Sequence, residues 1–141
     1  MAAFNKIQQF VEDLCKGVHD FTSTGTAAVT VALCAAANAP VATNAILSDL
    51  TEISYTNLST RVLAGITAEH TTGTVNLAAT DLVLTASGGA VAAFRYIVLY
   101  NDTPSSPLNP LIGWWDYGSD LTLADGETLT LDFTANWATL A

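Results

Sequence analysis

The sequence predicts an all-β fold, a jelly roll or β-sandwich of about eight antiparallel strands with one N-terminal amphipathic helix. Short β-favouring runs recur at intervals of roughly ten residues, with turn residues between them. Helical periodicity appears only near the start of the chain. A length of 141 residues suits one domain. We expect a helix over residues 1–17, the sandwich over 26–135 and a C-terminal tail over 136–141.

The N-terminal helix is predicted from apolar residues that recur every three or four positions. These are Phe4, Ile7, Phe10, Val11, Leu14 and Cys15. Gly17 suits the helix end, and Asn5 is an alternative start. The apolar face either covers the end of the sheet core or docks on a partner, and the periodicity fits both. The segment is too polar to be a signal peptide.

The first half of the sandwich is predicted from short runs. Asp20–Gly25 is turn-like, Thr26–Cys34 is a strand, and Ala35–Asn44 is a loop. Ala45–Ile53 fits either a helical turn capped by Ser48 or a brief strand near Thr51–Ile53. Further strands are expected at Ser54–Gly65, Thr74–Ala78 and Asp81–Thr85, whereas the polar, mixed run Ile66–Thr72 is assigned to no element.

The centre of the fold is predicted at Ala90–Tyr100, the longest expected strand. Its alternating residues are largely apolar on both faces, which indicates a central strand covered on both sides. Asn101–Pro110 holds three of the four prolines and reads as a loop. The chain returns as a strand at Leu111–Tyr117, where Gly113 permits a bulge or close packing.

The C-terminal third predicts a hairpin and a half-buried strand. Asp125-Gly126 is the hairpin signal between Asp120–Leu123 and Thr128–Thr134. In the second of these runs, Leu129, Leu131 and Phe133 share one face, which indicates that this face lies against the core.

The surface is predicted to be unusually poor in charge. Charged residues make up 12% of the chain, against about 25% in a typical domain, and hydrophobic residues make up 50%. A domain of this size cannot bury them all, so we expect a homo-oligomer, a dimer or trimer, or binding to a partner. The alternative is a monomer kept in solution by threonines and acidic charge. A net charge of −9 argues against nucleic acid or an anionic membrane as partner.

No catalytic, cofactor-binding or metal-binding constellation is found, and we expect no enzyme. Cys15 and Cys34 have no zinc-type spacing and are predicted to be buried free thiols, which suits a reducing cytosol. His19 and His70 each neighbour an acid, but adjacent strand residues point to opposite faces. The acidic C-terminal third leaves a carbohydrate-binding module as an alternative, because Trp114 and Trp115 lie beside acids. Of these two, one is expected in the core and the other at an interface.

Several segments in the same order resemble a family of small structural proteins of tailed bacteriophages, the capsid cement or decoration proteins. Besides the N-terminal helix, they are APVATN (39–44), DLTEI (49–53), FRYIVLYND (94–102), PLIGWWDYGS (110–119) and GETLTLDF (126–133). The resemblance implies a jelly-roll-like oligomer on the exterior of an icosahedral capsid, where it bridges major capsid protein subunits. It also implies synthesis in the host cytoplasm and incorporation into the virion. Some members sit in the neck or tail instead.

The residues predicted to anchor an interface are large aromatic side chains and one arginine. Aromatic residues bury large areas at low entropic cost, and Arg95 can pair with a sheet-face acid or with a carboxylate of the partner. The candidates are Phe4, Phe10, Arg95, Trp115 and Trp137.

Overall fold

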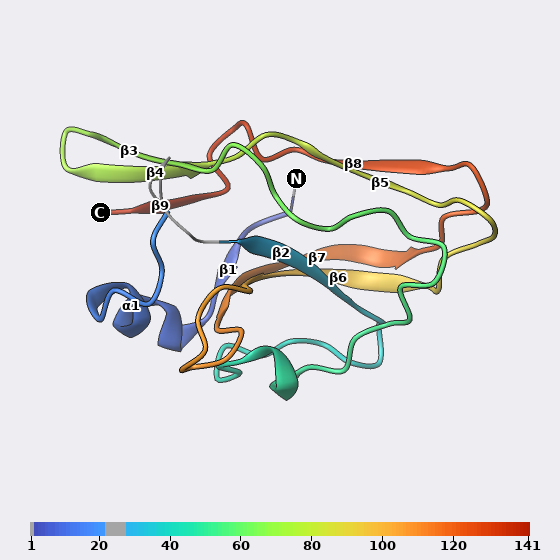
Figure 1. Ribbon diagram of the computed structural model, residues 1–141, viewed down its shortest axis with the longest axis horizontal. Helices are drawn as coiled ribbons and strands as arrows, with labels where there is room; N and C mark the ends of the chain where they lie inside the picture. The colour runs from blue at the N-terminus through green and yellow to red at the C-terminus, as the bar shows by residue number, and fades with distance from the viewer. Residues whose placement is uncertain (1, 22–27) are drawn as a thin grey trace.

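Two layers of antiparallel strands stack face to face, with a short helix at one end (Figure 1). The computed structural model describes residues 2–21 and 28–141. Its strands are β1 (Asn5–Lys6), β2 (Val29–Cys34), β3 (Thr67–Thr71), β4 (Thr74–Ala78), β5 (Leu82–Thr85), β6 (Phe94–Asn101), β7 (Leu111–Leu121), β8 (Thr128–Leu131) and β9 (Ala138–Leu140). The helix α1 spans Gln8–Cys15, and a 3₁₀ turn, η1, spans Leu47–Asp49. The predicted all-β sandwich with one helix is confirmed.

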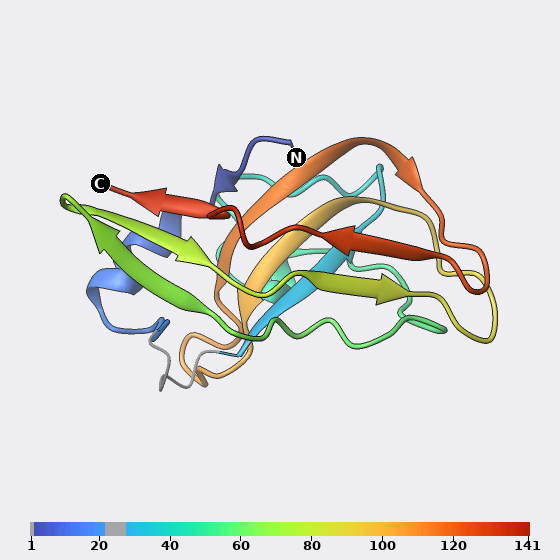
Figure 2. The same cartoon turned by 90° about the horizontal axis from the view of Figure 1, so that it is seen from above.

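The two layers differ in construction. The lower layer is one four-stranded sheet in the order β1-β7-β6-β2. The upper layer consists of a three-stranded sheet, β3-β4-β9, and a two-stranded sheet, β5-β8. The chain runs from β4 into β5 and from β8 into β9, so the two small sheets follow one another along a single long ribbon (Figure 2).

The core lies between the layers, and β6 is an inner strand of the lower sheet that faces it. It pairs with β7 on one side and with β2 on the other, as its two-sided apolar pattern predicted. Residues 97–101 are all buried. The longest strand is nevertheless β7, with 11 residues against 8 in β6. It continues past Tyr117 to Leu121 and includes the start of the run predicted separately as Asp120–Leu123.

The N-terminal segment differs from the predicted long helix. Asn5 and Lys6 pair with Trp114 and Gly113 of β7, and the Ile7 N–H still donates to the Ile112 carbonyl at 3.1 Å. The helix begins only after this ladder ends, because a residue cannot join both. Ile7 and Phe10 are fully buried, so the apolar side of this segment covers the chain's own core.

Three further predictions are corrected. Residues 67–71 form β3, whose side chains are all exposed, so no apolar pattern marked it. Thr72 and Gly73, with φ of 47° and 87°, make the tight turn into β4. The predicted tail contains β9, which pairs with β4. The turn at Asp125-Gly126 forms, but it joins no hairpin, because β8 pairs with β5 and not with β7.

Two smaller predictions concern the cysteines and the segment that follows the helix. Cys34 is buried as expected, whereas Cys15, at the end of α1, is exposed. Most of the predicted turn Asp20–Gly25 and the start of the predicted strand at Thr26 lie outside the described residues.

The outer edge of β2 is covered by an irregular segment, residues 53–63, where a strand was predicted over Ser54–Gly65. β2 is the last strand of its sheet, yet all six of its residues are buried. A buried edge needs partners for its outward N–H and C=O groups. The Ile53 N–H donates to Leu33 O at 2.9 Å, the Val31 N–H to Arg61 O at 2.9 Å and the Leu63 N–H to Val29 O at 2.8 Å.

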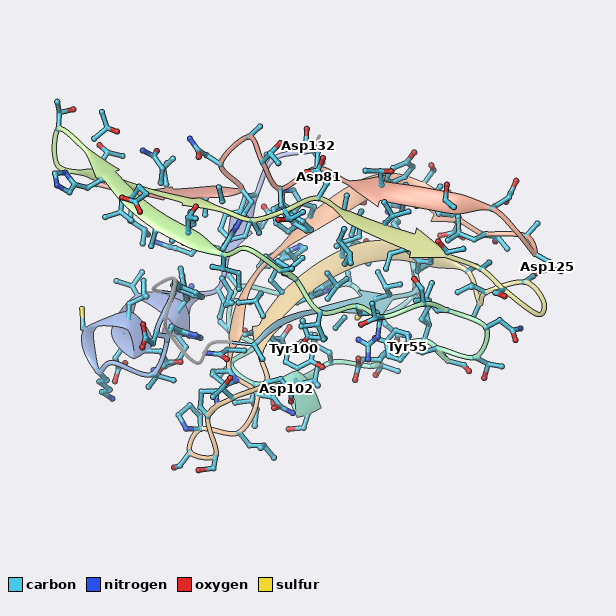
Figure 3. The ribbon with its side chains drawn as sticks, turned by 45° about the horizontal axis from the view of Figure 1, so that its top comes forward. Tyr55, Asp81, Tyr100, Asp102, Asp125 and Asp132 are labelled. Carbon is cyan, nitrogen blue, oxygen red and sulfur yellow. The ribbon has the colours of Figure 1, made fainter. Side chains whose placement is uncertain are left out.

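Side chains complete this coverage where the backbone of the segment departs from β2. The Leu33 N–H donates to the Tyr55 hydroxyl at 3.0 Å, and that hydroxyl donates to Glu52 (Figure 3). The Arg61 guanidinium donates to the Val31 carbonyl and lies 3.5 Å from the centre of the Tyr55 ring. A cation over an aromatic ring adds to the attraction between the two.

The same segment also reaches the upper layer. The Ser59 N–H donates to Thr85 O at 3.0 Å, and the Thr85 N–H donates to the Ser59 hydroxyl at 2.9 Å. The Ser87 N–H donates to Asn57 O at 2.9 Å. Residues 53–63 therefore close one long side of the sandwich by joining β2 to β5.

The hydroxyl of Tyr55 is expected to contribute to stability because the Leu33 N–H depends on it. Tyr55→Phe keeps the ring but leaves a buried donor unpaired, which should lower the free energy of unfolding by about 1–3 kcal/mol. Urea unfolding measures this. Tyr117→Phe is the matched control, since Tyr117 is 49% exposed. Equal losses in the two variants would contradict the role of Tyr55.

His19 is buried beside the helix and is neutral at physiological pH. Its ring stacks on Phe21 at 5.5 Å and meets the edge of Phe10 at 5.2 Å, and only 7% of the residue is exposed. Its Nδ1 lies 3.2 Å from the Asn101 amide nitrogen, which suits an Asn101 donor and an unprotonated Nδ1. Burial lowers the pKa of His19 to about 4, against the opposing charge of Asp13.

Stability is expected to fall as pH drops from about 6.5 to about 4. In that interval the unfolded chain binds a proton at His19 that the folded chain does not, so acidification favours unfolding by at most about 3 kcal/mol. His19→Gln should flatten the dependence of the urea midpoint on pH across this window. His70→Gln, on the exposed strand β3, should leave it unchanged. Identical profiles for the His19 variant and the parent would refute this assignment.

Candidate functional site

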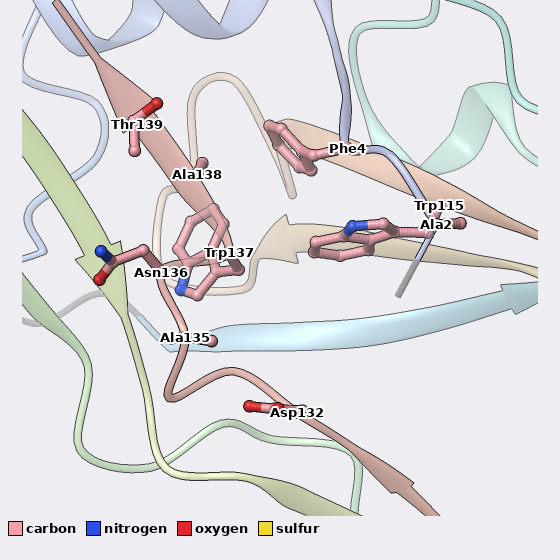
Figure 4. Close-up of a pocket in the computed structure, with 9 residues that line it drawn as sticks. All are labelled: Ala2, Phe4, Trp115, Asp132, Ala135, Asn136, Trp137, Ala138 and Thr139. Carbon is pink, nitrogen blue, oxygen red and sulfur yellow. The ribbon is translucent and has the colours of Figure 1, made fainter.

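An aromatic groove lies on the other long side of the sandwich, which residues 53–63 do not reach. It has a volume of about 590 Å³ (Figure 4). It runs between the N-terminal segment, β7 and the connection from β8 to β9. The lining residues are Ala2, Phe4, Trp115, Asp132, Ala135, Asn136, Trp137, Ala138 and Thr139.

The groove exists because Gly113 allows the N-terminal segment to lie directly on β7. A Cβ atom at Gly113 would sit 2.2 Å from the Phe4 ring and 2.7 Å from the Asn5 carbonyl oxygen. Both separations are far inside van der Waals contact, so only glycine fits. The close packing suggested at Gly113 from the sequence is thus present, and it sets the position of Phe4.

Three aromatic side chains from distant parts of the chain meet in the groove. The Phe4 ring centre lies 5.0 Å from that of Trp115 and 5.9 Å from that of Trp137. Trp115 contacts Phe133, and Trp137 contacts Phe21, at 5.8 Å and 6.2 Å. These are tilted and edge-on arrangements, which aromatic pairs favour. The groove wall is therefore continuous with the hydrophobic core.

Polar groups line the side of the groove formed by the β8–β9 connection. Asp132 accepts hydrogen bonds from the Thr134 hydroxyl at 3.0 Å and from the Thr134 N–H at 3.1 Å, and these hold its pKa below the ordinary value. Asp81 lies beside it (Figure 3) and accepts from the Phe133 N–H at 2.9 Å. The connection is thus held in shape by two carboxylates, of which Asp132 borders the groove.

Trp137 carries an unpaired hydrogen-bond donor at this site. The residue is only 5% exposed, and its indole nitrogen is buried without a hydrogen-bond partner among residues 2–21 and 28–141. Figure 4 shows this nitrogen on the side of the ring toward Ala135 and Asn136. A buried donor without an acceptor raises the free energy of the folded chain. A bound group with an acceptor oxygen would satisfy it.

The structure brings together three of the five predicted anchors, Phe4, Trp115 and Trp137. Phe4 is half-buried, whereas Trp115 and Trp137 are 4% and 5% exposed, so the two tryptophans are core residues rather than exposed anchors. The prediction that one of two adjacent tryptophans fills the core is confirmed, but Trp115 is that one and Trp114 is only partly buried.

Phe10 and Arg95 lie away from the groove. Phe10 is completely buried, packs against His19 and Phe21, and presents no surface to a partner. Arg95 donates to both oxygens of Asp116, at 2.7 and 2.9 Å, so it pairs within its own sheet. For Phe10, helical periodicity could not distinguish a core position from an interface position, because the same apolar face suits both.

Sequence reasoning did not bring together the polar residues of the groove: Asp132, Asn136 and Thr139. The run Trp137–Leu140 contains β-favouring residue types, but it is too short to distinguish a strand from a tail. Its pairing with β4 depends on the β8–β9 connection, where Asn136 takes a left-handed φ of 55°. No local signal predicts that turn.

The lining of the groove combines aromatic rings with a few polar groups. Its lining offers aromatic edges, one carboxylate, one amide and one hydroxyl, without histidine, cysteine, lysine or arginine. Within residues 2–21 and 28–141, no three His, Cys, Asp or Glu side chains gather in a way that could hold a metal ion. In the same ranges, no helix has the length and apolar character needed to cross a membrane.

The contact between Gly113 and Phe4 is expected to determine the shape of the groove. Gly113→Ala forces the Phe4 ring off β7 and should lower the free energy of unfolding by about 1–3 kcal/mol, the usual cost of overpacking. In a Phe4→Ala background the same change should cost less, because the ring that clashes is gone. A double-mutant cycle by urea unfolding measures the difference. Equal costs in both backgrounds would show that Phe4 does not require glycine at this position.

Comparison of the chain with family models, with curated proteins and with solved structures finds no match.

Proposed function

We propose that this chain is a structural virion protein, a capsid cement protein that binds the outer surface of an icosahedral phage shell and bridges major capsid protein subunits. The observation that carries the proposal is a complete, well-packed sandwich whose surface has few charges and several exposed apolar side chains. Such a surface favours contact with other protein. The ordered segments that resemble the cement family support it independently.

The exposed apolar residues are spread over several parts of the molecule. Among the large ones, exposure is highest at Leu108, 62%, and at Val41, 51%. Leu108 borders a hollow with Leu47 and Leu50, and a second hollow holds Ile46 and Pro107. Apolar area at these two hollows favours contact with another protein.

The chain itself is compact, so binding would use its surface and not an exchanged arm. Its accessible area is 6907 Å², close to the roughly 6,900 Å² expected for a folded monomer of this mass. Both terminal strands, β1 and β9, pair within the chain. Of the two uses predicted for the apolar face of the N-terminal helix, this favours covering the chain's own core over docking on a partner.

Two alternatives to a capsid cement protein are a neck or tail protein and a carbohydrate-binding module. A neck or tail location requires the same kind of surface and differs only in the partner. The other alternative is a carbohydrate-binding module using Trp114 or Trp115. A sugar stacks on an open ring face, which disfavours Trp115 at 4% exposure, whereas Trp114 is partly buried. A flat response in a tryptophan-fluorescence titration with glycans would remove that alternative.

Cryo-microscopy of the parent virion tests the proposal. We expect density for the sandwich on the outer face of the shell, at contacts between major capsid protein subunits. Density only at the neck or tail would refute the shell location. Light scattering of the purified chain after size exclusion gives the oligomeric state, for which we expect a dimer or trimer.

A further inference from the structure

The outer edge of β9 is open to strand addition. β9 lies at the end of the order β3-β4-β9 and pairs only with β4 in the part of the chain that the structure describes. Its central residue, Thr139, lies opposite Asn76, which in turn lies opposite Glu69 of β3. Along an antiparallel ladder, hydrogen-bonded pairs alternate with pairs that are not hydrogen-bonded. The pair Thr71 and Thr74, which flanks the two-residue turn at Thr72-Gly73, is of the hydrogen-bonded kind, and so is Glu69 with Asn76 two positions further on. The N–H and C=O of Asn76 therefore point toward β3. The Thr139 N–H and C=O therefore point outward.

The aromatic groove lies directly beside this edge. Thr139 and Ala138 of β9 line it together with Phe4 and Trp115 of the lower layer. Figure 2 shows β8 and β9 along one long border of the upper layer. An extended chain hydrogen-bonded to Thr139 would thus place alternate side chains in the groove, the arrangement by which exposed sheet edges recognise peptides.

A hydrogen-bond donor within the groove also lacks a partner in the part of the chain that the structure describes. The Trp137 indole nitrogen is buried and unpaired on the side toward Ala135 and Asn136, both of which line the groove. A peptide carbonyl is a suitable acceptor. Its approach would remove the cost of an unsatisfied buried donor, which strengthens binding beyond the ladder alone.

The charge of the groove and of the chain identifies the kind of segment. Asp132 is the single charged side chain among the lining residues. Three of the four basic residues of the chain, Lys16, Arg61 and Arg95, already pair with acids within it. With a net charge of −9, a second copy would bring like charge to this edge. The complementary occupant carries lysine or arginine opposite Asp132.

We propose that an extended, positively charged segment of a partner protein adds as a strand to the outer edge of β9 and fills the aromatic groove. This rests on the proposed function, since the partner would be a subunit of the particle. The contact with that subunit would then lie at one edge of the sandwich, the outer edge of β9.

Two variants test the edge and the charge separately, with binding to shells that lack this protein as the measurement. Thr139→Pro removes the outward N–H, which an edge strand tolerates, and Asp132→Asn removes the charge while keeping an acceptor for Thr134. Each should weaken binding in co-sedimentation by about tenfold or more. Hydrogen exchange at the Thr139 amide should slow when the shell is bound.

The controls make the same changes elsewhere. Ala68→Pro alters an outward N–H of β3, at the opposite edge of the same sheet, and Asp120→Asn removes an exposed charge near the end of β7. Both should bind as the parent does. Urea midpoints of all four variants confirm that each is folded at the temperature of the binding measurement.

The outcomes separate this inference from the proposed function. If the parent chain does not bind shells, the proposed function fails. If it binds and the two groove variants bind equally well, the shell role stands and the assignment to β9 is overturned. If Thr139→Pro instead dissociates an oligomer of the chain while shell binding is unchanged, the occupant of the edge is a second copy and the inference is likewise overturned.

Discussion

The hydrogen-bonding requirement of the buried β2 edge is the constraint on which the rest of the structure depends. β2 ends its sheet, yet no residue in it is exposed. Unpaired backbone groups in such a position would cost more free energy than a small domain can spare. Residues 53–63 supply partners from their backbone and from Tyr55 and Arg61. Because the segment must also reach β5, it cannot run as a regular strand beside either sheet.

The two long sides of the sandwich consequently have different roles. One side is closed by residues 53–63, which join the layers through hydrogen bonds. On the other side, aromatic packing joins the layers, where Phe4 lies on Gly113 between Trp115 and Trp137. Aromatic rings fill volume without covering the backbone edges that flank them. The edge of β9 and the groove beside it are therefore left accessible on that side.

Charge pairing within the chain accounts for the character of its surface. Arg95 is held by Asp116, and Arg61 approaches Glu52. With three of its four cations paired to acids, the chain presents mainly acids, small polar side chains and scattered apolar residues to its surroundings. At the edge of β9, a partner with complementary positive charge is favoured over a second copy, which would bring like charge there.

The sequence by itself determined the class of fold, the central position of β6, the inward face of β8 and the poverty of charge. These follow from alternation and composition, which act locally. It did not reveal β3, whose side chains are all exposed, or β9, which is too short to carry a pattern. Nor could it tell that Phe10 and Trp115 face their own core, because an apolar residue suits a core and an interface equally. Only the tertiary structure decided which edges are covered and that Phe4, Trp115 and Trp137 meet, since those outcomes depend on hydrogen bonds and contacts between segments far apart in the chain.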